Sequence, residues 1–359
     1  GMWTDTYDYV RLHQPHRMFT AGDVAWSPKR PPEYLADKEE VLSHLSDCLE
    51  VCRQSYSLET LFGYEYVGLR EEKINGSWVA NVELKHIATG DKRIIQTTRC
   101  MKAFGFRVPQ NPPLTLSSSK VRSITPDSDD LFTADFAESE APCYIVGGGK
   151  TAMDTATTIL TRFPQKNVSM IVGRGTVFLN RDKTFHKGLK RWIGGETTLQ
   201  GFLNLGLRYN GENEKEVMDY FKKHMSIQLD DDFENYFFGI LSERENEQIK
   251  NGLNGLIKDY LVDVKDAQSK PAIEFRSGDR LEIPDGSWII NCTGYIARQE
   301  HAYEPYLSPH ATTVSVQPTS GIHFLTTFGA YFLAHLQFLN LLPSLFLYEL
   351  DYQSLLRKN

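Results

Sequence analysis

"CYIVGGGKTAMDTATTIL", residues 143–160, is the stretch that decides the fold. An apolar strand end at 144–146 is followed by Gly147, Gly149 and Ala152 in a GxGxxA pattern, and then by helical sequence. The first glycine permits a tight turn, the second lets the backbone approach a pyrophosphate, and the small third residue lets the helix pack on the strand. The start of the helix then faces the negative charge. We therefore predict a diphosphate site on the backbone of Gly147, Gly148, Gly149, Lys150, Thr151 and Ala152.

The second strand of this unit, "VSMIV" at 168–172, ends in Gly-Arg-Gly. An NAD site normally has an acidic residue at this point, which binds the ribose hydroxyls. This sequence has Arg174 instead, so the site is predicted to take NADP. Charge-assisted hydrogen bonds of ~1.5–3 kcal/mol correspond to about ten- to a hundredfold in affinity. The alternative is a solvated arginine at a strand end. Lys150 is either a phosphate ligand or plain surface, and Arg181 in "LNRDK" is a weaker candidate.

Length and charge narrow the class of protein. A chain of 359 residues is long enough for two packed domains. With 39 basic against 46 acidic residues the net charge is -7, which argues against nucleic acid as a partner. Five cysteines are an odd number, and charged residues replace an apolar secretory core in the first twenty positions. Cys48 and Cys52 do not form a CxxC pair. These features favour reduced thiols and a cytoplasmic protein.

The most apolar segment is "FGAYFLAHLQFLNLLPSLFLYEL", which starts at Phe328. His335, Gln337, Asn340 and Pro343 interrupt it, and each is costly in hydrocarbon. A buried C-terminal helix is therefore favoured over a membrane contact, and no stable membrane insertion is expected.

The rest of the chain divides into recognisable pieces. Residues 37–53 read as a helix, and "LFGYEYVGL", "SWVANVELKHI" and "KRIIQTTRC" as a small antiparallel meander with turns at "NGS" and "TGDK". Residues 143–175 form a βαβ unit of a parallel sheet. A helical insertion or lid is expected at about 185–262, with "KEVMDYFKKHM" and "ENEQIKNGLNGLIKDYLVDV" as its clearest pieces. Strands return at "AIEFRS" and "SWIINCTG", before the apolar helix.

Four segments together resemble a known family. "YDYVRLHQPHRM", "YLADKEEVLSHL", "GGGKTAMD" and "NCTGY" occur in the order seen in flavin-containing monooxygenase-like proteins. These are flavoproteins with two dinucleotide-binding motifs, related to Baeyer–Villiger monooxygenases and to the wider FAD-NAD(P)-binding pyridine nucleotide oxidoreductases. The resemblance covers most of the chain, and the expected helical insertion contributes little to it.

The resemblance implies an FAD site as well as an NADP site. In that family an FAD-binding GxGxxG opens the chain, and the NADP motif comes later. No GxGxxG precedes Gly147, so the first motif is expected to be missing and the chain to be N-terminally truncated. His13 stands about where family members place a polar side chain beside the isoalloxazine, with Gln14 next to it; both are the expected catalytic residues. Their alternative is a satisfied loop histidine and its neighbour. The remaining flavin-binding candidates are Trp3, Arg11, Thr293 and Gly294.

The same family pattern sets the expected domains. "MKAFGFRVP" near Gly105 is similar to the first of two ATG-like crossings between the flavin and NADP domains, with Phe104 in place of threonine, and "CTG" matches the second. The fold class expected is α/β: a Rossmann-like NADP-binding domain with a parallel sheet, joined to the remainder of an FAD-binding domain with the meander. The expected domains are 1–140 (FAD remainder), 141–294 (NADP domain with its insertion) and 295–359 (C-terminal return).

The resemblance implies an NADPH-dependent flavoprotein oxidoreductase of the monooxygenase type, acting on a small-molecule substrate. The alternative is a non-catalytic NADP-binding protein that has lost flavin; a relative of the disulfide reductases is disfavoured by the absence of a CxxxxC or CxxC pair. None of the ten histidines has zinc-ligand spacing, and no metal is expected. The run from Asp230 to Asp232 reads as a helix cap and solvated face. The expected protein partner is a further copy of the same chain, in a homo-oligomer.

Overall fold

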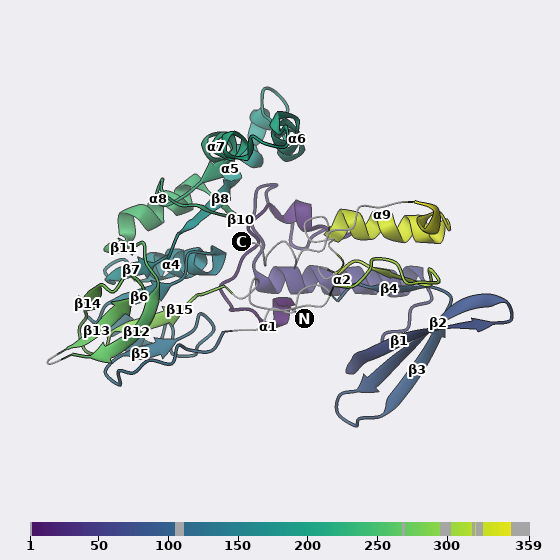
Figure 1. The fold of residues 1–359 in the computed structure, drawn as a ribbon, viewed down its shortest axis with the longest axis horizontal. Coiled ribbons are helices and arrows are strands. Elements are labelled where there is room, and N and C mark those ends of the chain that lie inside the picture. Colours follow the sequence, from purple (N-terminus) through teal and green to yellow (C-terminus); the bar gives the residue numbers. More distant parts are fainter. Residues whose placement is uncertain are drawn as a thin grey trace. The chain divides into compact units, whose positions relative to one another are not determined.

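The computed structural model describes residues 2–104, 111–267, 270–294, 303–317, 320 and 326–345. The chain forms two compact units (Figure 1): one contains Trp3–Cys52 and Pro109–Gly294, the other Arg53–Val108 and Tyr295–Asn359. The break after Gly294 lies where the second crossing was expected. The chain also passes between the units at 52/53, which was not expected, and at 108/109, beside the first expected crossing and not near residue 140.

A five-stranded sheet forms the centre of the first unit. Its order is β11-β7-β6-β15-β5, and all neighbouring strands are parallel. The pairing of Trp288 with Arg122 makes β5 an edge strand of this sheet. For this reason the domain begins well before residue 140. The strands are β5 (Arg122–Ile124), β6 (Cys143–Val146), β7 (Val168–Ile171), β11 (Gly255–Ile257) and β15 (Trp288–Asn291).

Both faces of the parallel sheet are covered. Successive side chains of a strand point to opposite faces, so neighbouring residues of β6 pack on different layers. Cys143 and Ile145 of β6 lie in an apolar cluster with buried residues of helices α4 (Lys150–Arg162) and α8 (Glu243–Gly252). Tyr144 and Val146 instead pack on a three-stranded antiparallel sheet. That second sheet consists of β12 (Leu261–Asp266), β13 (Pro271–Phe275) and β14 (Arg280–Glu282), and the short helix α3 (Ala134–Glu138) precedes β6. Figure 1 shows these layers, and the α/β class with a parallel sheet is confirmed.

The expected helical insertion at 185–262 is helical in its first half and again in α8, but it also contains strands. Helix α5 (Arg181–Thr184) and the 3-10 turn η2 (Gly188–Arg191) lead to α6 (Thr198–Arg208) and α7 (Glu214–His224), which includes most of "KEVMDYFKKHM". Between His224 and α8 the expectation of helix was wrong. Strands β9 (Ser226–Ile227) and β10 (Asn235–Leu241) pair with β8 (Thr176–Asn180).

The second periodic piece, "ENEQIKNGLNGLIKDYLVDV", was also predicted as one helix. Only α8 is helical; it ends at Gly252, and the next apolar residues form β11 and β12. A short apolar run that forms a covered strand cannot be told from a buried helix by periodicity. The two Asn-Gly pairs in this piece were the available signal for the break.

The N-terminal part of the first unit contains α1 (Met2–Asp5), the 3-10 turn η1 (His16–Phe19) and α2 (Lys38–Ser55). A small apolar cluster of Leu12, Ala36 and Val41 holds this part together. The helix expected at 37–53 is confirmed.

The second unit contains the expected meander. Strands β1 (Tyr64–Ile74), β2 (Ser77–His86) and β3 (Lys92–Thr97) are antiparallel in that order. The turn between β1 and β2 has Asn75 at φ 49° and Gly76 at φ 86°, the positive values that a tight hairpin needs. The Glu71 carboxylate accepts hydrogen bonds from Ser308 and Thr312, and so ties the meander to the returning C-terminal segment.

The rest of the second unit is a parallel pair with a helix. Strand β4 (Cys100–Lys102) pairs with β16 (Thr313–Ser315), and α9 (Thr326–Phe338) with the 3-10 turn η5 (Leu342–Ser344) follows. Leu333 and Leu336 of α9 are buried, whereas Tyr331 is 76% exposed. The expected C-terminal helix is thus confirmed to Phe338, and the "FLYEL" end of that run lies outside the described residues. In the described part of the chain, no helix has the length and apolar character needed to cross a bilayer.

Candidate functional site

The glycine turn lies at the carboxyl end of β6, between the ends of β7 and β15. Gly147 has φ 135°, and a Cβ there would come within 2.5 Å of the Cys292 carbonyl oxygen. A Cβ on Gly148 would lie 3.0 Å from the Val172 carbonyl oxygen. The turn is therefore held between two neighbouring strand ends, and only glycine fits at position 147.

The outer side of the turn is open. Gly149 is the N-cap of α4, no side chain caps this helix, and no atom lies within 4 Å of a Cβ placed on Gly149. The N–H groups of Lys150, Thr151 and Ala152 donate to no acceptor among the described residues. The Ala152 side chain is fully buried, which allows α4 to approach the sheet. The turn thus presents free amides at the point in a doubly wound sheet where such folds hold ligands.

Arg174 lies directly beside this turn. It sits between Gly173 and Gly175, whose φ values are 59° and 65°. The Cα of Gly175 would be 3.5 Å from a Cβ on Gly148, so the two loops are in contact. The Arg174 side chain is exposed, and it has no hydrogen bond or ion pair with any described residue. Its guanidinium is therefore available to an anion bound at the turn.

Lys150 is not directed at the turn's open face. Its Nζ pairs with Asp154 one turn along α4 and lies 3.8 Å from Glu245 Oε1. Asp154 also accepts a hydrogen bond of 2.9 Å from the Tyr7 hydroxyl. The Lys150 ammonium group thus interacts with two carboxylates, which argues against a role as a phosphate ligand.

Arg181 is an internal residue. It is 6% exposed; its Nε donates to the His13 carbonyl oxygen at 2.7 Å, and its Nη1 lies 2.6 Å from Glu245 Oε2. Its guanidinium thus links β8, α8 and the N-terminal segment. The weaker prediction of Arg181 as a ribose-phosphate ligand finds no support in this arrangement.

Glu245 is the carboxylate between Lys150 and Arg181. Burial opposes its ionisation, but the two cations and hydrogen bonds from Ser242 outweigh that cost and lower its pKa to about 2. Ser242 and Glu245 also form the capping box that starts α8. The S-x-x-E spacing in "SERE" was a readable signal for this cap, although nothing in the sequence indicated that the same carboxylate would hold Arg181.

His13 is hydrogen-bonded to β10, whereas the described atoms show no such bond for Gln14. His13 Nδ1 accepts a hydrogen bond of 3.3 Å from the Ile240 N–H. Burial, followed by the charges of Lys150 and Arg181, lowers the pKa of His13 to about 4. The imidazole is therefore neutral at pH 7. Gln14 Oε1 is buried and has no partner among the described atoms.

Trp3 and Arg11 also contact other protein groups. The Trp3 ring lies edge-on to Phe19 at 5.8 Å between centroids, in the N-terminal apolar cluster. Arg11 Nη1 donates to the Leu35 carbonyl oxygen at 3.2 Å. The four N-terminal candidates for the flavin site are therefore gathered in one unit, but three of them have protein partners.

Thr293 and Gly294 lie where the chain leaves the first unit, next to the glycine turn. Thr293 Oγ1 donates to Asn291 Oδ1 at 2.7 Å, and its carbonyl oxygen accepts from Asn111 Nδ2 at 2.5 Å. The segments at 111 and 293 are therefore side by side. No atom lies within 4 Å of a Cβ placed on Gly294. Phe104 is 60% exposed, and Gly105 lies outside the described residues.

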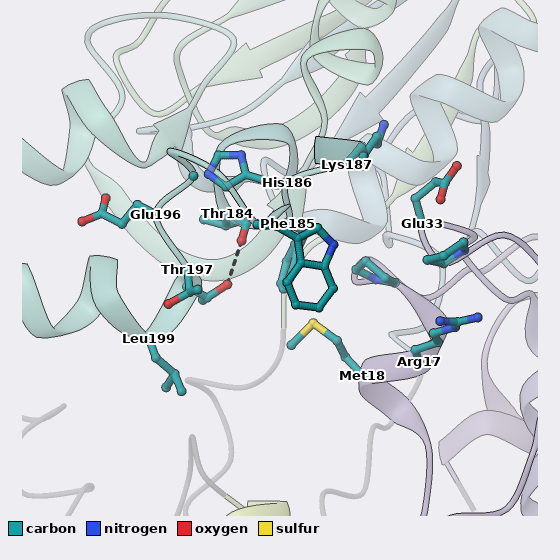
Figure 2. A pocket seen from close by; sticks show the side chains of 16 residues that line it. Arg17, Met18, Glu33, Thr184, Phe185, His186, Lys187, Glu196, Thr197 and Leu199 are labelled. Atoms are coloured by element: carbon teal, nitrogen blue, oxygen red, sulfur yellow. Dashed lines mark hydrogen bonds between the residues drawn. The ribbon is translucent and has the colours of Figure 1, made fainter. Parts of the chain in front are cut away.

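Two hollows flank these elements. A cleft of about 510 Å³ runs along α4 and is lined by side chains of both charges, among them Arg11, Lys150 and Glu245. A pocket of about 490 Å³ lies between the N-terminal loop and residues 184–199. Figure 2 shows Arg17, Met18 and Glu33 entering this pocket from the N-terminal loop, opposite Phe185 and His186.

Neither the acidic run nor the cysteines forms a metal site in the described structure. Lys258 pairs with Asp230 at 3.3 Å and with Asp232 at 2.9 Å. All five cysteines are free thiols, and burial raises the pKa of Cys292 to about 12. Among the residues with defined positions, no group of three histidine, cysteine or acidic side chains could hold a metal ion.

The sheet order, the glycine turn and the antiparallel covering sheet define a Rossmann-like fold of the dinucleotide-binding type. No protein-family model and no curated protein sequence matches the chain. Three solved structures show distant likenesses, each with a TM-score below 0.5. One is the ornithine N-hydroxylase of Kutzneria sp. 744, at 11% identity and a TM-score of 0.45, over 86% of this chain and 78% of that one.

Two further structures fall in the same range. Bacillithiol disulfide reductase Bdr from Bacillus cereus has 12% identity and a TM-score of 0.43, over 90% of this chain and 80% of the other. Tmm from Pelagibacter sp. strain HTCC7211 has 12% identity and a TM-score of 0.46, over 98% of this chain and 64% of the other.

Proposed function

We propose that this chain binds NADP(H) at the glycine turn, as part of a flavin-dependent oxidoreductase of the monooxygenase type. One observation carries the nucleotide assignment: the open first turn of α4 lies beside the loop that carries Arg174, whose exposed side chain has no partner among the described residues. The free amides of Lys150, Thr151 and Ala152 would bind the diphosphate, which the positive end of the helix dipole also favours.

The choice of NADP over NAD rests on the end of β7. A carboxylate there would bind the ribose hydroxyls of NAD and repel a ribose phosphate. Two acidic residues are joined to this loop: the Glu234 N–H donates to the Arg174 carbonyl oxygen at 3.3 Å, and the Gly173 N–H donates to the carbonyl oxygen of Asp259 at 3.0 Å. The Asp259 side chain is held within the protein, because its carboxylate accepts from the N–H groups of Tyr260 and Ser277. Arg174 is the exposed basic side chain of this loop, and we assign it to the ribose phosphate.

The flavin part of the proposal rests on the family resemblance and on the position of Thr293 and Gly294 beside the turn. Bound NADPH would supply a hydride, and dioxygen would be the oxidant: one oxygen atom would enter a small-molecule substrate and the other would leave as water. The N-terminal candidates fit a flavin less well, because Trp3, Arg11 and His13 have protein partners. This observation favours a second candidate function, a non-catalytic NADP-binding protein without flavin.

The nucleotide assignment is tested by titrating NADPH and NADH into the wild-type protein and into Arg174→Gln. Loss of a charge-assisted contact should weaken NADPH by about ten- to a hundredfold and leave NADH nearly unchanged. Arg244→Gln is the matched control, because Arg244 is exposed on α8. Equal weakening of both nucleotides, or no change in either, would remove the ribose-phosphate role.

The flavin assignment has its own test, the absorption spectrum of the purified protein. Bound flavin gives a band at roughly 450 nm through its own chemistry. A colourless protein that still binds NADPH, even after incubation with FAD, would favour the non-catalytic alternative.

A further inference from the structure

Helix α6 is apolar on two faces, and only one of them is covered. Gly201 is buried against Met225, and Leu205 packs on the cluster of Leu179, Met225 and Ile240. On the opposite side, a second row recurs at every fourth residue, the spacing of one helix face. This outer row is Leu199, Leu203 and Leu207, which are 78%, 54% and 75% exposed.

The loop before α6 adds large apolar side chains to this row. Leu189, Trp192 and Ile193 are 77%, 82% and 72% exposed. Figure 2 shows Leu199 extending away from Phe185, toward the outside of the pocket. Single exposed apolar residues are common, but six within 19 positions mark an interaction surface. We call these six residues the 189–207 surface.

The charge around this surface decides what kind of partner fits it. Residues 182–208 contain two acidic residues, Asp182 and Glu196, against five basic ones, although the whole chain has a net charge of -7. Asp182 lies 3.3 Å from Lys187. Lys187, Lys190 and Arg208 are exposed. A contact between two copies through this surface would bring like charges together, which is unfavourable. An anionic partner would be attracted to it. The five basic residues are Lys183, Lys187, Lys190, Arg191 and Arg208.

We propose that the 189–207 surface binds reversibly to an anionic lipid membrane. Leucine and tryptophan side chains that protrude beside lysines are typical of segments that lie in the headgroup region, with their apolar side chains at the acyl boundary. Each lysine near an anionic surface adds a favourable electrostatic contribution. The contact is peripheral, involves no spanning helix, and does not depend on the nucleotide site.

The test is co-sedimentation of the full chain with vesicles of phosphatidylcholine and phosphatidylserine at 3:1, and with phosphatidylcholine alone. Binding is expected only to the anionic vesicles, and it should weaken as salt is raised. Leu203→Gln with Leu207→Gln should reduce the partition coefficient at least about tenfold. Lys187→Gln and Lys190→Gln should each reduce it by about fivefold. Leu45→Gln, on the exposed side of α2, is the control and should bind like the wild type.

Far-UV circular dichroism and the unfolding midpoint show whether each variant is folded. Failure of the wild type to bind anionic vesicles would overturn the proposal, as would equal binding to both kinds of vesicle. A sedimentation-velocity mass of two chains that falls to one chain in Leu203→Gln/Leu207→Gln, without vesicle binding, would identify the surface as an interface between copies instead. None of these outcomes depends on NADPH, so the nucleotide proposal stands or falls separately.

Discussion

The glycine turn at 147–152 and the N-terminal segment at 3–14 were both predicted to bind a cofactor, but they differ in how far their polar groups are already bonded to protein. The turn has open space outside Gly149 and free amides at the start of α4. In the N-terminal segment, His13 is bonded to β10, and Arg11 to the loop at Leu35. The turn remains available to a ligand, whereas most of the N-terminal candidates are used to hold the protein together.

The difference shows which kinds of site a sequence motif can specify. A site made of backbone amides depends on chain direction and on the absence of Cβ atoms, and both are encoded locally by glycine and helix signals. A site made of side chains depends on which groups, distant in sequence, form hydrogen bonds or ion pairs with those side chains in the folded protein. Here Glu245, 64 residues from Arg181, and Ile240, 227 residues from His13, determine what these two side chains do.

Gly147→Ala should have the largest effect and would test whether the turn is determined by its backbone. The new methyl group would meet the Cys292 carbonyl at 2.5 Å, at a φ of 135°. We expect a loss of about 3–5 kcal/mol in the free energy of unfolding. Gly149→Ala, where the space is open, should lose about 1 kcal/mol or less but still weaken NADPH binding. Equal destabilisation in urea melts would contradict this account.

Glu245→Gln tests the ion-pair cluster that holds the N-terminal segment. Removing the carboxylate leaves the guanidinium of Arg181, which is 6% exposed, without its charge partner. We expect the free energy of unfolding to fall by about 3 kcal/mol. Glu247→Gln, exposed on the same helix, is the control and should change stability by less than about 0.5 kcal/mol. Similar unfolding midpoints for the two variants would show that the cluster contributes little.

The pH dependence of stability probes the state of His13. Its pKa falls from 6.5 to about 4 on folding, so the unfolded chain takes up a proton first as the pH drops. The contribution of His13 is therefore complete above pH 6.5 and is lost between pH 6.5 and pH 4, by about 2 kcal/mol. Urea unfolding at pH 7, 5.5 and 4.5 measures this slope, and His13→Gln should flatten it. An unchanged slope in the variant would mean that other groups cause it.

Arg11→Gln should have the smallest effect. The side chain is exposed, and its hydrogen bond to Leu35 is a surface contact. We expect less than about 0.5 kcal/mol of destabilisation and an unchanged affinity for NADPH. A clear loss of flavin absorbance in this variant would instead show that Arg11 contributes to cofactor binding. The N-terminal segment would then also be a cofactor site, like the glycine turn.

Local signals predicted the parts of the fold that they encode. The βαβ unit, the meander with its Asn-Gly turn, and helices α2, α7 and α9 follow from periodicity and turn residues. The strands predicted at "AIEFRS" and "SWIINCTG" are present as β13 and β15. Strands β9 to β12 were missed, because short strands in covered sheets lack an alternating pattern. The edge position of β5 was missed because three residues give no periodic signal. At the site, the turn and Arg174 could be read from sequence, whereas the role of Glu245 required the fold.

The hydrogen bond between Asn111 and Thr293 brings the two ends of the segment 111–293 together. The incoming and outgoing segments meet at 2.5 Å, so nearly two hundred residues begin and end at almost the same point. Chain ends that lie together are what allows one domain to be inserted within another or permuted without loss of its core. A short peptide joining residues 111 and 293, with new termini opened in the exposed turn around Gly211, should therefore preserve the parallel sheet and its glycine turn.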